Sequence, residues 1–378
     1  MFGIAGHPLT TSLKLMPNKG TFLFGIDELK ARWLAFDYLR AVAIILIVLG
    51  HSVYNSEKGF PVLLENIVRG GTAVFVFISG YFLHAVFAQN FQFQAFLLKK
   101  WKGVVVPFLF VSFVGLVFKL LGWWWLDGLP LEKVALNLFY TVKNFYVLYP
   151  HWYIPFIMVV FLLSPLYLAY LQLPLWRQLL LFALFSILAV MLHRPHGNAG
   201  VIQSLLYYTP FYLLGMLFSL YRVFLIKHYK PLLLVSALLF MGALIMQTWV
   251  VPWVGNYHKW FFKYRGIDFQ FVQKVGLCIL LLALCYLLSM WKGIWLCLDR
   301  WLREVGELSF AIFFLHPLLT LAMNNLFPLL GWSKVPGGAW FSVFMTCVVF
   351  CIHFLGSFYI ARAIRYSLAY QSRWLIGA

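Results

Sequence analysis

Ten apolar segments, each long enough to cross a lipid bilayer, follow one another along most of this chain of 378 residues. A membrane-crossing helix needs about 20 consecutive, mainly apolar residues. Only 11% of the residues are charged, against about 25% in an ordinary soluble domain. We therefore predict an all-α integral membrane protein. Its ten spans are expected at approximately residues 36–56, 68–88, 103–122, 150–171, 177–193, 203–225, 231–251, 271–291, 306–326 and 339–363.

The placement of lysine and arginine residues predicts how these spans are oriented. With an even number of spans, both termini lie on one side, which carries 17 of the 29 basic residues, against 11 on the other side. Because basic residues are enriched in cytoplasmic loops, we expect both termini in the cytoplasm. Residues 1–35 and 367–378 would then be cytoplasmic tails, and residues 36–366 one membrane domain. Residues 131–148 are expected to form a non-cytoplasmic loop or an interfacial helix.

Arg40 and His51 are ionisable residues inside the first apolar segment. A helix turns by about 100° per residue, so the step from Arg40 to His51 places both on one face, about 16 Å apart along the axis. Asp37 lies near the same stripe. Ionisable groups inside a membrane are costly and usually mark a functional interior, so we expect the chemistry on this helix. The simpler alternatives are a helix-packing role for His51 and an Asp37–Arg40 pair that anchors the helix.

Three motifs together resemble the acyltransferase-3 family of membrane O-acyltransferases. The first is an aromatic-Asp-x-Leu-Arg run with the spacing Arg-x10-His, the second approaches Gly-x-x-x-Phe-Phe-x-x-Ser-Gly-Tyr, and the third reads Ser-x-x-Ile-x-x-x-His-Pro. In this chain they are Phe36–Arg40 with His51, Gly71–Tyr81, and Ser309–Pro317. The resemblance covers roughly residues 30–366. The chain departs from the family where Lys99-x-x-Lys102 replaces Arg-x-x-Arg, because lysine lacks the planar fork that grips phosphate.

The resemblance implies transfer of an acyl group from cytoplasmic acyl-CoA, commonly acetyl-CoA, to a hydroxyl of a cell-envelope polysaccharide or lipid-linked glycan. It further implies a multi-pass protein of the bacterial inner membrane, without a metal, that could contact the polysaccharide-synthesis machinery. An imidazole with an ordinary pKa near 6.5 can accept the hydroxyl proton, so His51 is expected to be the general base. Arg40 is expected to hold the donor nearer the cytoplasm.

The remaining predicted site residues come from the same motifs and from the start of the fourth span. The expected catalytic residues are His51, Asp37 and His316, the donor-binding residues are Arg40, Lys99 and Lys102, and the acceptor-binding residues are Ser79, Tyr81, His151, Trp152 and Tyr153. Structural alternatives stand beside them. Lysines at this position also anchor the cytoplasmic side, Ser and Gly also pack helices, and Trp and Tyr also form interfacial belts.

Two other classes of function remain open from the sequence. A transporter or flippase for an envelope glycan or lipid is one, although no inverted repeat is visible. A noncatalytic subunit of a polysaccharide-synthesis complex is the other. The net charge of +18 does not indicate nucleic-acid binding, because the basic residues are dispersed over many loops. The five cysteines are expected to be free thiols, and the loop residues His193, Arg194 and His196 show no recognisable metal-ligand spacing.

Overall fold

The computed structural model describes residues 26–143, 147–198, 200–264, 266–291, 293, 296–330 and 337–378. Most of the predicted N-terminal tail, residues 1–25, lies outside the described residues. The α-helices are α1 Ile26–Ser52, α2 Val62–Val68, α3 Gly71–Phe82, α4 Phe93–Lys100, α5 Val106–Leu121, α6 Leu131–Lys143, α7 Tyr153–Leu162, α8 Ser164–Leu171, α9 Leu175–Leu192, α10 Val201–Leu220, α11 Arg222–Lys227, α12 Tyr229–Ile245, α13 Phe269–Met290, α14 Leu296–Glu307, α15 Ser309–Leu329, α16 Ala339–Leu368 and α17 Ser372–Leu375.

Shorter elements join these helices. The π-helical and 3₁₀ turns are η1 Leu83–Phe87, η2 Ala88–Asn90, η3 Trp101–Val105, η4 Gly122–Leu126, η5 Tyr149–Trp152, η6 His196–Asn198, η7 Met246–Val250 and η8 Ala369–Gln371. The strands β1 Arg194–Pro195 and β2 His258–Lys259 pair in parallel. The segment that was expected to be a loop or an interfacial helix forms α6.

Nine helical stretches of the described chain are long and apolar enough to cross a membrane, and they become ten if a bent helix pair is counted as one span. This pair, Tyr149–Leu162 and Ser164–Leu171, is bent by 55°. Pro165 stands at the start of α8 and has no backbone N–H to continue the preceding helix. The prediction of an all-α membrane protein with about ten spans is confirmed, whereas the orientation of its termini stays a prediction.

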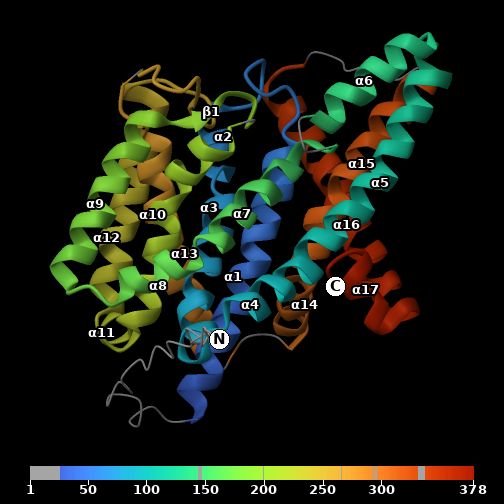
Figure 1. Ribbon diagram of the computed structural model, residues 1–378. Coiled ribbons are helices and arrows are strands. Elements are labelled where there is room, and N and C mark those ends of the chain that lie inside the picture. Colours follow the sequence, from blue (N-terminus) through green and yellow to red (C-terminus); the bar gives the residue numbers. More distant parts are fainter. Residues whose placement is uncertain are drawn as a thin grey trace, which may run out of the picture.

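Helix α1 runs through the middle of the bundle (Figure 1), where it packs against α3, α13, α14, α15 and α16. Helices α9, α10 and α12 lie on one side of it, and α5, α15 and α16 lie on the other. The elements α4, α14 and α17 lie toward the end where α1 begins, and α2 and β1 lie toward the end where it stops. Side chains along α1 can therefore take part in sites at both ends of the molecule.

Glycine residues bring the helices around α1 into backbone contact. A Cβ atom at Gly80 would lie 2.1 Å from the carbonyl oxygen of Tyr212, and one at Gly215 would lie 2.0 Å from that of Phe77. No larger residue fits at this crossing of α3 and α10, which is how small residues pack helices in membranes. Gly80, which belongs to the second motif, therefore has a packing role, and it fixes the position of the adjacent Ser79.

The C-terminal segment folds back onto the bundle. The chain reverses at Ala369, which has a φ of 41°, and α17 then packs against α5. The hydroxyl of Ser372 donates hydrogen bonds to the carbonyl oxygens of Ala369 at 2.6 Å and Ala378 at 3.0 Å. Because Ile376 is buried, the last ten residues form part of the packed structure at the end where α1 begins.

Candidate active site

A cavity of about 480 Å³ lies beside the middle of α1 and is called the Arg40 cavity below. Its described lining carries four cations and one carboxylate. Its polar residues are Arg40, Ser79, Lys99, Lys100, Tyr212, Glu307, Ser309 and Arg373, and its aromatic residues are Phe75, Phe82, Phe87, Phe96, Phe161 and Phe310. The carboxylate of Glu307 also pairs with Arg365, at 2.8 Å. A cleft with this charge attracts polyanions.

Arg40 reaches this cavity as half of an ion pair. Its Nη1 atom lies 3.3 Å from Oδ1 of Asp37, and its guanidinium lies 4.7 Å from the ring centroid of Phe82. The expected Asp37–Arg40 pair therefore forms. Asp37 lines neither this cavity nor the second one, so its place beside Arg40 indicates a positioning role. Both side chains are 34% exposed, which leaves Arg40 accessible to a ligand.

The lysines at the start of the third span do not share one face. Lys99 and Lys100 line the Arg40 cavity, with Nζ of Lys100 lying 4.6 Å from the ring centroid of Phe161. Lys102 does not line it and instead lies 5.3 Å from the ring of Trp374. The reason is the π-helical turn η3, which changes the phase of the helix.

A second cavity, of about 240 Å³, lies beside the last turns of α1 and is called the His51 cavity. Its described polar lining consists of His51, Ser56, Glu57, Glu65, Arg69, Thr72, Tyr149, Trp152, Arg194, Tyr208, Asn256, His258 and Lys274. The ring of His51 lies edge-on to Tyr149 at 5.7 Å and stacks on His316 at 5.6 Å. His51 thus lines a polar chamber rather than the lipid-facing surface. Its role as the base stays a prediction.

His316 is completely buried beside His51. Its Nδ1 lies 3.0 Å from the carbonyl oxygen of Ile312, which can only accept a hydrogen bond, so Nδ1 carries the proton of the neutral ring. The Nε2 atom, which then has a free lone pair, has no hydrogen-bond partner among the described residues. His353 lies close by, bonded to Ser52 at 2.9 Å and to Thr320 at 3.2 Å. The sequence motifs gave no reason to include His353.

Comparison with known protein families assigns the chain to one of them. The model of the acyltransferase-3 family, described as an acyltransferase domain, matches residues 33–362. The chain belongs to the acyltransferase-3 family. No curated protein and no solved structure matches it. The family membership and the apolar helices together make this chain a multi-pass membrane acyltransferase.

The predicted acceptor-binding residues of this acyltransferase lie at different places. Trp152 lines the His51 cavity, and Ser79 lines the Arg40 cavity. The hydroxyl of Tyr153 hydrogen bonds with Ser79, and its ring contacts those of Trp152 and Phe313 at 6.3 and 5.6 Å. Tyr153 therefore lies between the two cavities and joins a residue of one to a residue of the other.

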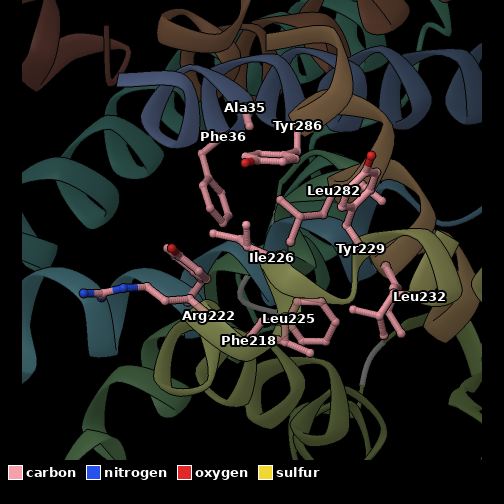
Figure 2. A pocket seen from close by; sticks show the side chains of 13 residues that line it. Ala35, Phe36, Phe218, Arg222, Leu225, Ile226, Tyr229, Leu232, Leu282 and Tyr286 are labelled. Carbon is pink, nitrogen blue, oxygen red and sulfur yellow. The ribbon is translucent and has the colours of Figure 1, made fainter. Parts of the chain in front are cut away.

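His151 and Tyr81 line neither of the two polar cavities. His151 is buried, with Nδ1 3.3 Å from the hydroxyl of Ser112. Tyr81 packs against Phe36 with ring centroids 4.0 Å apart and lines a small apolar crevice of about 70 Å³ between α1, α10 to α12 and α13. Figure 2 shows the apolar side chains of this crevice, with the head of Arg222 reaching away from them. The predicted acceptor contacts of His151 and Tyr81 therefore gain no support from their positions.

Buried amide side chains hold the loops that close the His51 cavity. Asn66, on α2, accepts a hydrogen bond from the backbone N–H of Gly255 at 2.7 Å and donates to the carbonyl oxygen of Trp253 at 3.0 Å. Gln203 donates to the carbonyl oxygens of Leu192 at 2.9 Å and Lys259 at 3.2 Å. These bonds tie the two strand segments to α2 and α10, and so they fix Arg194 and His258 at the cavity.

The charges of the His51 cavity come from elements far apart in sequence. Burial, together with the positive charge of Arg194, lowers the pKa of His258 to about 3, so this ring is neutral near pH 7. The Nη2 atom of Arg69 lies 2.5 Å from Oε1 of Glu65. Among the described residues no group of three His, Cys, Asp or Glu side chains is placed to hold a metal ion.

Helix α3 forms a wall shared by both cavities. Thr72 lines the His51 cavity, and Phe75, three residues later, lines the Arg40 cavity. Three residues correspond to a rise of about 4.5 Å along a helix. Along this wall, less than one helical turn therefore separates the two cavities.

Proposed function

We propose that this acyltransferase moves an acyl group from acyl-CoA, with acetyl-CoA as the first candidate, to a hydroxyl of a cell-envelope polysaccharide or lipid-linked glycan. We further propose that it lies in the bacterial inner membrane with both termini in the cytoplasm. The Arg40 cavity would then receive the donor from the cytoplasm, and the His51 cavity would receive the acceptor. The observation that carries this proposal is the pair of cavities along α1, one cationic and one containing a histidine.

The charges of the Arg40 cavity support a coenzyme A donor. Phosphate groups are best bound by arginine and lysine, and this cavity offers Arg40, Lys99, Lys100 and Arg373 from three different helices, α1, α4 and α17. Positive groups distributed in this way suit phosphates at more than one position along an extended molecule. The aromatic lining between them suits the apolar parts of such a donor.

The short separation along α3 supports direct transfer. A donor held by its phosphates in the Arg40 cavity needs to extend its acyl end past the turn between Phe75 and Thr72 to reach the His51 cavity. Holding two reactants in this way replaces a bimolecular encounter and lowers the barrier. Tyr153, which is bonded to Ser79, would line this passage.

The proposed reaction uses His51 as the proton acceptor. His51 takes the proton of the acceptor hydroxyl, whose oxygen attacks the thioester carbonyl carbon. The carbon–sulfur bond then breaks, and the sulfur of coenzyme A leaves. It takes the proton from His51, which restores the neutral histidine. Arg69 lines the same cavity, and its positive charge favours the oxygen anion that develops on the carbonyl group.

The test uses protein purified into lipid nanodiscs, radiolabelled acetyl-CoA, and envelope glycans extracted from cells that lack the gene. We expect His51→Ala to lower labelling of the glycan by roughly 10²-fold or more, because general-base catalysis contributes about that much. Coenzyme A binding by this variant should remain. His228→Ala is the matched control, since the exposed ring of His228 bonds the carbonyl oxygen of Phe224 and lines neither cavity. Full labelling by His51→Ala would contradict the proposal.

A further inference from the structure

His51 occupies the last turn of α1, which ends one residue later at Ser52. The last carbonyl groups of a helix have no N–H partner within the helix, and helix ends fray unless other groups hold them. One such group is Arg69, whose Nη1 donates to the carbonyl oxygen of Gly50 at 2.8 Å. A catalytic group has to be held within about 0.5 Å of its productive position. The other contacts of this turn therefore matter for any reaction at His51.

His353, on α16, bonds the residue that follows His51. It is 2% exposed, as is Ser52. The hydroxyl of Ser52 donates to the carbonyl oxygen of Val48 at 2.8 Å. Because a hydroxyl has one proton, Ser52 accepts from Nδ1 of His353, which lies 2.9 Å away. Nδ1 therefore carries the proton of the neutral ring, and Nε2 has a lone pair.

The Nε2 atom of the same ring bonds α15. The hydroxyl of Thr320 donates to it at 3.2 Å. Thr320 lies about one helical turn after His316, and its hydroxyl is also 3.2 Å from the carbonyl oxygen of His316. The bonds Ser52–His353–Thr320 are called the His353 bridge below. The bridge joins the helices that carry His51 and His316, whose rings stack at 5.6 Å.

Two further polar residues of α16 hold the chain that follows α1. The hydroxyl of Thr346 accepts from the backbone N–H of Tyr54 at 2.9 Å. The hydroxyl of Ser342 accepts from Nδ2 of Asn55 at 3.3 Å. Ser342, Thr346 and His353 are all buried, and their spacings of four and seven residues place them on one face of the helix. Polar groups inside a membrane are costly and usually functional, and this polar face of α16 holds the end of α1.

We infer that His353 is a positioning residue for acyl transfer, which holds the ring of His51 against His316 by bridging α1 and α15. His353 lines neither cavity, so it acts through His51 and not on a substrate. This inference rests on the proposed function, in which His51 is the base. It adds to that function a residue from outside the three sequence motifs.

The first experiment compares two substitutions of His353 that differ in hydrogen bonding more than in size. His353→Leu packs well in a membrane helix but bonds neither partner, and it should lower kcat about tenfold, because a displacement of about 1 Å can cost up to about 10²-fold. His353→Gln offers both a donor and an acceptor, so it should keep kcat within about threefold of the wild type. The measurement is transfer of radiolabel from acetyl-CoA to glycan by protein in nanodiscs. Full kcat in His353→Leu, or a higher kcat in His353→Leu than in His353→Gln, would overturn the inference.

A second variant and a control complete this experiment. Thr320→Val keeps the shape of the side chain and removes the hydroxyl that donates to His353, so kcat should fall about threefold; this variant decides if His353→Leu does not fold. His84→Leu is the matched control. Nδ1 of His84 lies 2.8 Å from the hydroxyl of Ser219 and joins η1 to α10, and the residue lines neither cavity. Equal losses of kcat in His84→Leu and His353→Leu would overturn the inference.

The second experiment needs no acyl transfer. Diethyl pyrocarbonate modifies the unprotonated nitrogen of a histidine, and Nε2 of His316 is such an atom, buried beside His51 without a hydrogen-bond partner among the described residues. Without the bridge, His51 moves away from His316, and the rate at which His316 is modified should rise roughly tenfold, as expected when a contact held by two hydrogen bonds opens locally. Mass spectrometry of peptides measures this rate. An unchanged rate in both His353→Leu and Thr320→Val would overturn the inference.

The two measurements separate this inference from the proposed function. If the wild type transfers no acyl group but modification of His316 rises in His353→Leu, the bridge does hold His51 and the proposed reaction fails. If the wild type transfers acyl groups and His353→Leu matches it in kcat and in modification of His316, the reaction stands and the inference fails.

Discussion

The two cavities along α1 differ in how their charged groups are held. In the Arg40 cavity the four cations extend from three helices, and Lys99 and Arg373 are exposed. In the His51 cavity Arg194 and Lys274 are buried, and amide side chains such as Asn66 and Gln203 fix the loops around them. Adaptable cations suit a large donor that binds and leaves. Fixed cations suit the placement of one hydroxyl against one histidine.

The largest effect on the donor side is expected from removing Arg40, the cation that α1 contributes to the donor cavity. Arg40→Ala should lower kcat/KM for acyl-CoA by roughly 10- to 100-fold, the equivalent of one or two charged hydrogen bonds. Steady-state kinetics with varied acyl-CoA, together with coenzyme A binding, measure this effect. Arg177→Ala is the control, since Arg177 lies beside Trp176 and away from both cavities. Unchanged kcat/KM and unchanged coenzyme A binding in Arg40→Ala would contradict the assignment of the donor to this cavity.

His316 tests the His51 cavity, where we expect a substitution to change kcat and not the KM for acyl-CoA. His316→Ala should lower kcat by about tenfold, because the ring of His51 loses the neighbour on which it stacks. The KM for acyl-CoA should stay within about twofold, since His316 does not line the Arg40 cavity. A variant that instead raises KM and leaves kcat unchanged would place His316 on the donor side.

The sequence predicted the placement of those site residues that lie on a single helix. Arg40 and His51 occupy one apolar segment, and helical periodicity places both toward the bundle interior, each in its own cavity. The stacking of His316 on His51 could not be read in this way, because it joins residues 265 positions apart. Arg194, Lys274 and Arg373 likewise lie on separate elements, and their local sequences resemble ordinary loop or helix positions.

The lysine pair shows where the spacing of a sequence motif does not predict which side chains line a cavity. Lys99 and Lys102 were both expected to bind the donor, but only Lys99 lines the cavity, together with Lys100. Pro107 has no N–H to donate to the carbonyl oxygen of Gly103. The N–H of the preceding Val106 donates to the carbonyl oxygen of Trp101, five residues back, as in a π-helix. A prediction based on regular α-helix geometry has no means of including this turn.

Substitutions of Lys100 and Lys102 test whether only the first of them contacts the donor. Lys100→Ala should raise the KM for acyl-CoA about three- to tenfold, because a half-buried cation that lines the proposed donor cavity is lost. Lys102→Ala should change it by less than about twofold, since Lys102 lies over Trp374. Thermal unfolding of both variants serves as the control for structural damage. Equal effects on KM would mean that the π-helical turn does not separate the two lysines when the donor is bound.

The smallest effect is expected at Arg373, which lies in the C-terminal segment beyond the residues that match the family model. Exposed charges contribute about 0.2–1 kcal/mol, so Arg373→Ala should raise the KM for acyl-CoA by no more than about fivefold. The effect should shrink further as salt is added. Arg362→Ala is the matched control, because Arg362 is also exposed but pairs with Glu304, at 3.2 Å.

A loss of activity in Arg373→Ala as large as that of Arg40→Ala would change the comparison of the two cavities. It would mean that the folded C-terminal segment holds the donor as firmly as α1 does, and that the Arg40 cavity is also preorganised. A small, salt-dependent effect would support adaptable cations on the donor side. In that case the segment that follows α16 adjusts donor affinity, and the rigid placement of reacting groups belongs to the His51 cavity.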